Sequence, residues 1–174
     1  MAILEIRKYP DPVLREVSRP IEIIDKKVRI LAKDMAETMR NANGLGLAAP
    51  QVGMAVRMVV IEFDLEKHDP RVLVNPVIVK RIGRREERDE GCLSFPELRS
   101  QVKRSPRVIC QAQNLEGEIV RHDVEGLIAR AMQHETDHLD GMLFVDKVGP
   151  SDKQSLRRDL AEMERNWSET HSGR

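Results

Sequence analysis

Hydrophobic residues recur every three or four positions over residues 25–43, the spacing of one face of an α-helix. The members of this stripe are Val28, Leu31, Ala32, Met35, Met39 and Ala42. Asp25 stands where an N-cap residue belongs, and Gly44 follows where a helix can end in the left-handed conformation. The pattern therefore predicts an amphipathic helix between Asp25 and Gly44.

Short runs rich in Val and Ile, separated by Gly, Pro and Asn, predict β-strands in the middle of the chain. They cover residues 56–63, 71–80, 98–103, 107–113 and 118–122. Helical spacing returns from about Val124 to Asp140, where Gly141 closes the helix. A third helix is expected from Ser151, whose hydroxyl and Gln154 form a capping-box pattern. Strands clustered between helices indicate an α+β fold rather than repeating βαβ units.

The composition narrows the functional classes. The chain has 174 residues, which suits one domain, and its 29 basic and 29 acidic residues cancel. A balanced charge gives no electrostatic reason to expect DNA or an anionic membrane as a partner. There is no apolar run of about 18 residues and no secretory signal at the start. We therefore expect a cytoplasmic protein in which each cysteine is a free thiol or a ligand rather than half of a disulfide.

The second predicted helix carries the strongest chemical signal, His134-Glu135-Thr136-Asp137-His138. Histidines four residues apart lie one turn apart on the same helix face, so both can reach one metal ion. Both histidines and Glu135 fall on the apolar side of this helix, where ionisable groups are costly unless they are paired. The polar side carries Arg130, Gln133, Thr136, Asp137 and Asp140. A metal ion explains this placement better than three separately satisfied core residues.

A catalytic tetrahedral site needs a third protein ligand and an open position for water. The candidates are Cys92, Cys110, His68, His122 and further carboxylates. Cys92 follows Gly91 in a turn of small and polar residues, and that glycine permits close approach of another element. Cys110 has the surroundings of a core residue in a strand. Spacing alone leaves the choice of the third ligand open. It also leaves open whether Glu90 and Arg99 pair to position the cysteine loop or form an ordinary surface ion pair.

Three segments together resemble the three signature motifs of the peptide deformylases. They are Gly44-Leu45-Gly46-Leu47-Ala48-Ala49-Pro50-Gln51, Glu90-Gly91-Cys92-Leu93-Ser94 and the His134–His138 segment. The resemblance implies mostly antiparallel strands packed around a central helix that carries the histidines, with N-terminal and C-terminal helices. It also implies a catalytic domain over residues 1–150, with residues 151–174 as the C-terminal helix and polar tail of the same domain.

The reaction implied by the resemblance removes the N-formyl group from the N-terminal formylmethionine of newly synthesised polypeptides and releases formate. Cys92, His134 and His138 would hold one divalent metal ion per chain. In this family that ion is usually Fe²⁺, with Zn²⁺, Ni²⁺ or Co²⁺ able to occupy the site, whereas ligand type alone suggests Zn²⁺. Glu135 would act as general base and acid for a metal-bound water that attacks the formyl carbon.

The resemblance also implies how the substrate is held. The Gln51 side-chain amide and the Leu93 backbone N–H would stabilise the formyl oxygen. The backbone of Gly46 would pair with that of the substrate as an added strand does. Leu127 and Ile128 are expected either as walls of the methionine pocket or as core residues.

The C-terminal helix of bacterial relatives is implied to contact the ribosome. Here that helix carries Lys153, Arg157, Arg158 and Arg165. These residues permit such a contact, and they equally fit a solvated helix face.

Two other functions compete with deformylation. A zinc endopeptidase also uses the H-E-x-x-H pattern, but its extended form fails here, because Phe144 stands where a third histidine would be. A non-catalytic metal-binding or ribosome-docking module would close its fourth metal position with protein. Three ligands beside a well-placed acid favour the enzyme.

Overall fold

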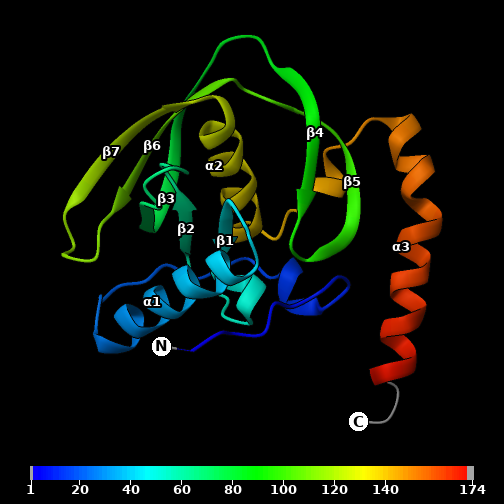
Figure 1. The fold of residues 1–174 in the computed structure, drawn as a ribbon, viewed down its shortest axis with the longest axis horizontal. Coiled ribbons are helices and arrows are strands. Elements are labelled where there is room, and N and C mark those ends of the chain that lie inside the picture. Colours follow the sequence, from blue (N-terminus) through cyan, green and yellow to red (C-terminus); the bar gives the residue numbers. More distant parts are fainter. Residues whose placement is uncertain (1, 172–174) are drawn as a thin grey trace.

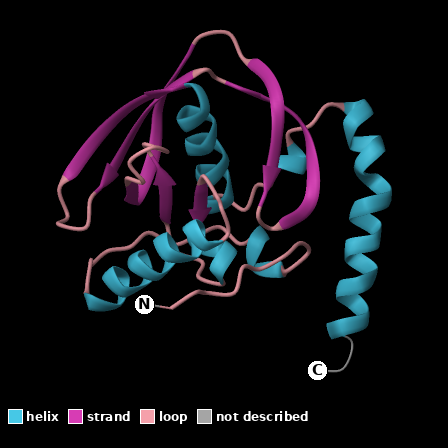
Figure 2. Cartoon of the chain, viewed as in Figure 1, coloured by secondary structure: helices cyan, strands magenta, loops and turns pink. Residues whose placement is uncertain are grey.

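The computed structural model describes residues 2–171, which form three α-helices and seven β-strands (Figures 1 and 2). The helices are α1 (Lys26–Asn41), α2 (Gly126–Leu139) and α3 (Pro150–His171). The strands are β1 (Gly46–Ala48), β2 (Met58–Glu62), β3 (Pro70–Ile82), β4 (Glu86–Cys92), β5 (Phe95–Arg104), β6 (Arg107–Gln113) and β7 (Ile119–Glu125). None of the helices in this part of the chain is long and apolar enough to cross a membrane.

The strands form two antiparallel sheets with α2 between them. The larger sheet has five strands in the order β1-β2-β3-β6-β7, and the smaller is the β4–β5 hairpin. Figure 1 shows α2 between the large sheet and this hairpin, with α3 along the outer side of β5. The expected α+β fold, with antiparallel strands around a central helix, is confirmed.

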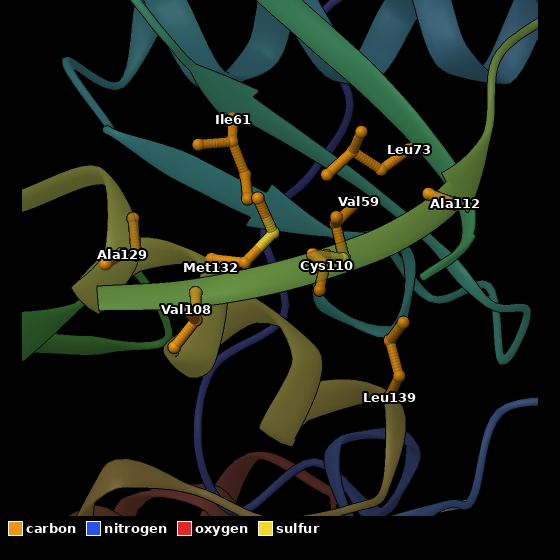
Figure 3. Close-up of a cluster of buried hydrophobic side chains, with 11 residues drawn as sticks. Val59, Ile61, Leu73, Val108, Cys110, Ala112, Ala129, Met132 and Leu139 are labelled. Atoms are coloured by element: carbon orange, nitrogen blue, oxygen red, sulfur yellow. The ribbon is translucent and has the colours of Figure 1, made fainter. Parts of the chain in front are cut away.

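Strand β2 of the large sheet is apolar on both faces. Val59 and Ile61 of β2 contact the cluster that contains Met132 of α2 (Figure 3), whereas Met58 and Val60 contact the cluster of α1. Successive residues of a strand point to opposite faces, so a strand covered by helices on both sides is an uninterrupted apolar run. This explains why β2 has five buried residues in succession.

Helix α1 matches its prediction at the start and differs from it at the end. The Asp25 carboxylate accepts a hydrogen bond from Val28 N–H at 2.9 Å, as an N-cap does. The left-handed residue after the helix is Asn43, with φ of 51°, and not Gly44. Asparagine tolerates this conformation. Gly44 is instead a point of close packing, since a Cβ there would lie 2.8 Å from Leu93 Cδ1.

The predicted strands all exist, and the strand over residues 107–113 is confirmed at both ends as β6. The other boundaries differ by a few residues. Helix α2 begins at Gly126 rather than Val124 because β7 continues through Glu125. Strands β1 and β4 were not predicted, and β4 includes Cys92, which was expected in a turn.

The start of α3 corrects a second capping prediction. The helix begins at Pro150, and Lys153 N–H donates to the Gly149 carbonyl at 2.9 Å. Ser151 therefore lies inside the first turn and is not the N-cap. Proline suits the first helical position because its φ is already helical and its missing N–H would have no partner there.

Candidate metal centre

A cleft of about 580 Å³ opens between β1, the β4–β5 hairpin and α2. Its lining brings together residues from all three segments of the expected site. From the predicted set it includes Gly46, Gln51, Cys92, Leu93, Leu127, His134 and Glu135. Gly46 and Glu135, which are 89 positions apart in the sequence, thus share one cavity.

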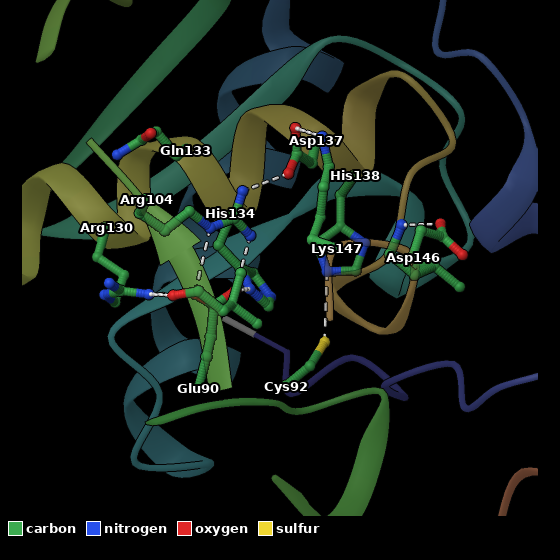
Figure 4. Close-up of polar contacts among 12 residues, drawn as sticks. Glu90, Cys92, Arg104, Arg130, Gln133, His134, Asp137, His138, Asp146 and Lys147 are labelled. Carbon is green, nitrogen blue, oxygen red and sulfur yellow. Dashed lines mark hydrogen bonds and ion pairs between the residues drawn. The ribbon is translucent and has the colours of Figure 1, made fainter. Parts of the chain in front are cut away.

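Ligand atoms of Cys92, His134 and His138 all lie within 4.8 Å of one another, and Cys92 and His134 line this cleft. Cys92 Sγ is 3.3 Å from His138 Nε2, and the two imidazole rings lie 5.0 Å apart on α2 (Figure 4). A thiol and two imidazoles at this separation can hold one divalent ion of the zinc or iron type.

The other candidates for the third ligand lie elsewhere. Cys110 is fully buried in the large sheet, where burial raises the pKa of its thiol to about 11. The ring of His122 packs edge-on against Phe63, 5.3 Å away. His68 lies in the loop between β2 and β3. Of these candidates only Cys92 joins the histidines.

Glu90 fixes the imidazole ring of His134 through its Nδ1 atom. Its carboxylate lies 2.6 Å from His134 Nδ1 and accepts hydrogen bonds from Arg104 and Arg130 at 2.7 and 3.0 Å. Burial alone would raise the pKa of Glu90, but the bonds to His134 and Arg104 outweigh burial and lower it far below its usual range. With Nδ1 engaged, His134 directs Nε2 towards Cys92, the arrangement found when a carboxylate orients a metal-ligating histidine.

Buried arginines tie the hairpin to α2. Arg104 of β5 also pairs with Asp137 of α2 at 2.5 Å. Arg130 of α2 donates to the carbonyl oxygens of Val102 and Glu86, each at 2.9 Å. These directional bonds fix the strand that carries Cys92 against the helix that carries the histidines.

The pairing considered for Glu90 and Arg99 is absent. Arg99 pairs with Asp89 instead, and its guanidinium lies over Gly91, where a Cβ would be 2.9 Å from Arg99 Nη1. Adjacent residues of a strand face opposite ways, so Asp89 faces Arg99 while Glu90 faces α2. The glycine before the cysteine does permit a close approach, and the approaching group is Arg99.

Glu135 projects into the cleft as a buried carboxylate without a full set of partners. It is 4% exposed, and its Oε2 has no hydrogen-bond partner among residues 2–171. Burial raises its pKa to about 7. A Cβ on Gly46 would lie 2.5 Å from Glu135 Oε1, so only glycine in β1 leaves room for this side chain.

Burial acts on the two histidines in the same direction, but their partners differ. It lowers the pKa of His138 well below its ordinary value, and a charge on His134 would lower it further. For His134 burial is outweighed by Cys92 and Glu90, which raise the pKa. The neutral imidazole that a metal requires is therefore favoured at His138 by the protein alone.

Gln51 and Leu93 lie beside the sulfur of Cys92. Gln51 is 1% exposed, and its side-chain Nε2 lies 3.5 Å from Cys92 Sγ. Leu93 follows Cys92 directly, and its carbonyl accepts a hydrogen bond from Lys8 Nζ at 2.5 Å. Burial lowers the pKa of Lys8, which also lines the cleft. Sequence reasoning missed Lys8, because no local pattern relates residue 8 to residue 93.

The two apolar residues expected at the methionine pocket have different positions. Leu127 lines the cleft, together with Leu45, Phe95 and Ala131. Ile128 does not line it and borders a neighbouring hollow next to Phe63. Leu45, Ala131 and Phe95 were not predicted as lining residues.

Two histidines and a cysteine beside a buried carboxylate, at the base of a cleft, have the composition of a metal-dependent hydrolase site. The family profile described as Polypeptide deformylase matches residues 3–154. The chain is 43% identical over 167 residues to the peptide deformylase of Acidobacterium capsulatum, covering 95% of this chain and 98% of that one. It is 50% identical over 152 residues to peptide deformylase 1 of Clostridium acetobutylicum, with coverages of 87% and 99%.

Solved structures agree with these relatives. The fold matches peptide deformylase from Plasmodium falciparum with a TM-score of 0.89 at 36% identity, covering 95% of this chain and 98% of that one. It matches the enzyme from Legionella pneumophila with a TM-score of 0.86 at 40% identity, covering 96% and 98%. The chain therefore belongs to the polypeptide deformylase family. It is an enzyme, and this membership supports removal of the formyl group from nascent peptides.

Proposed function

We propose that this chain is a metal-dependent hydrolase that removes the formyl group from N-terminal formylmethionine and releases formate. One observation carries the proposal: Cys92, His134 and His138 converge next to a buried oxygen of Glu135 that lacks a partner. A carboxylate in such a position needs a water or a substrate group to satisfy it. A hydrolytic reaction brings both a water molecule and a substrate amide to this carboxylate.

The proposed ligands of the ion are Cys92, His134 and His138, one thiolate and two imidazoles. The side chains fit a divalent ion, because Glu90 engages His134 Nδ1 and so leaves Nε2 for coordination. When bound, the ion lowers the pKa of a coordinated water towards neutrality and so supplies a nucleophile. We propose Fe²⁺ as the resident ion on the family resemblance, with Zn²⁺, Ni²⁺ or Co²⁺ as replacements.

Glu135 is proposed as the general base and acid. Its raised pKa, about 7, lets the carboxylate accept a proton from water near neutral pH and return it to the leaving amine. Gly46 supports this role, since the Glu135 side chain occupies the space that a Cβ at residue 46 would fill.

The formyl oxygen is proposed to accept hydrogen bonds from the Gln51 side-chain amide and the Leu93 backbone N–H. Both residues line the cleft next to Cys92. Fixed donors of this kind favour the transition state because the oxygen gains charge only as the water attacks.

The substrate backbone is proposed to pair with Gly46, and its methionine side chain to contact Leu127. β1 lies at the edge of its sheet and is paired through β2 on one side only. A free edge next to a cleft can accept a peptide as a further strand. Ile128 remains a prediction as a second wall, because it lines the neighbouring hollow with Leu127 and does not line the cleft itself.

The remaining predictions concern context. We propose that residues 1–150 act as the catalytic domain and that residues 151–174 complete it. We also propose that the enzyme works in the cytoplasm, where formylated chains are synthesised. Contact of α3 with the ribosome rests on its Lys153, Arg157, Arg158 and Arg165 and on the family resemblance.

Formate release from a short N-formylmethionyl peptide tests this function, using chain prepared without oxygen and loaded with Fe²⁺ or Ni²⁺. We expect formate together with an intact deformylated peptide. The unformylated peptide serves as control and should remain whole. Peptide fragments would favour a zinc endopeptidase, and bound metal without formate would favour a non-catalytic module.

A further inference from the structure

The two ends of the Gln51 side chain have distinct partners. Oε1 accepts a hydrogen bond from Ala48 N–H at 2.9 Å, so the opposite end must be the amide nitrogen. That nitrogen donates to the hydroxyl of Ser94 at 3.2 Å. Ser94 is fully buried and Gln51 is 1% exposed, so water does not replace this bond.

Ser94 belongs to the two-residue turn of the β4–β5 hairpin, directly after Leu93. The chain near the N-terminus holds this turn and Gln51 at once. Tyr9 N–H donates to the Ser94 carbonyl at 2.9 Å, and Arg7 N–H donates to the Gln51 carbonyl at 2.7 Å. The backbones of Ser94 and Gln51 are therefore fixed relative to one another, which leaves the side-chain bond with a defined length and direction.

An amide nitrogen has two hydrogens. One hydrogen of Gln51 Nε2 is directed to Ser94, and the other points towards Cys92 Sγ at the wall of the cleft, 3.5 Å from the nitrogen. If the amide turned over, its oxygen would face the developing negative charge and repel it. Ala48 N–H opposes that turn, because it can only donate and therefore needs the amide oxygen opposite it. The Ser94 hydroxyl accepts from the nitrogen at the other end and so fixes where that nitrogen lies.

We propose that Ser94 is a positioning residue that aims the Gln51 amide at the formyl oxygen. This role rests on the proposed function and adds a residue to it. Ser94 does not touch the reacting atoms; it acts through Gln51. Displacement of a donor by about 1 Å can reduce turnover by up to about 100-fold. We expect a loss of about 10-fold on removal of the hydroxyl, because Ala48 still holds the other end of the amide.

A double-mutant cycle tests this role, with kcat and KM for formate release measured on Ser94→Ala, Gln51→Ala and the double variant, each with its bound metal quantified. We expect Ser94→Ala to lower kcat about 10-fold without changing KM or metal content. In the Gln51→Ala background the same substitution should change nothing further.

A second readout does not depend on activity. In the Zn²⁺-loaded chain, the side-chain amide signals of Gln51 in an ¹⁵N-correlated NMR spectrum should shift in Ser94→Ala. The matched control is Ser18→Ala, because Ser18 is also buried but its hydroxyl has no hydrogen-bond partner among residues 2–171. That substitution should leave the Gln51 signals and kcat unchanged.

Losses that multiply in the double variant, or unchanged kcat and Gln51 signals in Ser94→Ala, would overturn the positioning role alone. A wild-type chain that binds metal and releases no formate would overturn the proposed function, and this role with it. If Ser94→Ala does not fold, Ser94→Cys keeps the volume with a weaker acceptor. Ser94→Cys should then lower kcat when Gln51 is present and change nothing further in the Gln51→Ala background. An unchanged kcat in Ser94→Cys would count against the role.

Discussion

Helix α2 contacts the two sheets in different ways. Towards the large sheet it presents Ala129, Met132 and Leu139, all fully buried among apolar side chains. Towards the β4–β5 hairpin it presents Arg130 and His134, which are also buried but are both paired with Glu90 of β4. One helix thus joins an apolar core to an ionic one.

The apolar contacts of α2 contribute mainly to the stability of the fold, whereas its ionic contacts position the residues of the site. Apolar contacts are non-directional, so they stabilise the sheet against α2 without fixing an atom to within a fraction of an ångström. The bonds of Arg104 and Arg130 to Glu90 are directional and buried, and they determine where Cys92 stands relative to His134. The proposed metal centre lies on the ionic side.

The largest expected effect is on turnover at Glu135. Glu135→Gln keeps the size of the side chain but removes the base, so formate release should fall by about 10² to 10⁴. The bound metal should stay at the wild-type level, as measured by elemental analysis. Wild-type turnover in this variant would remove Glu135 from the mechanism.

The ion pairs between α2 and the β4–β5 hairpin can be disrupted by substitution of Glu90. Glu90→Gln removes the charge that orients His134, and metal affinity should fall by about 10-fold to 100-fold. Leu73→Ala is the matched change on the apolar side. It should destabilise the chain by about 2–5 kcal/mol while leaving metal affinity unchanged.

Competitive chelator titrations and urea unfolding measure the two quantities. If Leu73→Ala weakened metal binding as much as Glu90→Gln does, the two sides of α2 would not differ as described.

The two cysteines sharpen the comparison further. Because burial raises the pKa of Cys110 to about 11, this thiol should resist thiol reagents in the folded chain at pH 8. Cys92 should react in the metal-free chain and be protected once metal is added. Cys110→Ala should cost about 1 kcal/mol of unfolding free energy and no metal. Mass spectrometry of the labelled peptides distinguishes the two sites, and labelling of Cys110 first would contradict the assignment.

The smallest effect is expected at Tyr9, outside both sides of α2. Its hydroxyl donates to Glu164 of α3 at 2.5 Å, and burial together with this bond raises the pKa of Tyr9 to about 12. A raised phenol pKa stabilises the fold below the unfolded value of about 10, and that contribution is lost as the pH rises towards 12.

Tyr9 is the sole tyrosine of the chain, so its ultraviolet titration gives a single transition. Glu164→Gln should move the midpoint down towards 10. A wild-type midpoint near 10 would mean that α3 is not held by this bond.

The sequence predicts the parts of the fold that depend on local pattern. Strand β6 follows from a run rich in Val and Ile and the N-cap of α1 from Asp25, and both are confirmed. The seven residues of β4 contain five charged ones and show no apolar alternation, so that strand is invisible to periodicity. It forms because β5 pairs with it and because its Glu90 forms ion pairs with Arg104 and Arg130.

The same limit applies to the candidate site. The spacing of His134 and His138 predicts a shared ligand pair, and the structure brings Cys92 to them. Arg130 and Gln133 were assigned to the polar side of the helix, yet they are only 7% and 4% exposed. In sequence, a buried polar helix face looks the same as a solvated one when its partners, such as Arg104, come from a distant strand.

The central claim is that Cys92, His134 and His138 form one metal centre, and Co²⁺ titration of the metal-free chain tests it most directly. A thiolate-to-cobalt charge-transfer band should appear and saturate at one equivalent of Co²⁺ in the wild type. It should persist in Cys110→Ala and Glu135→Gln and be absent from Cys92→Ala. A band that survives in Cys92→Ala and disappears in Cys110→Ala would contradict the account.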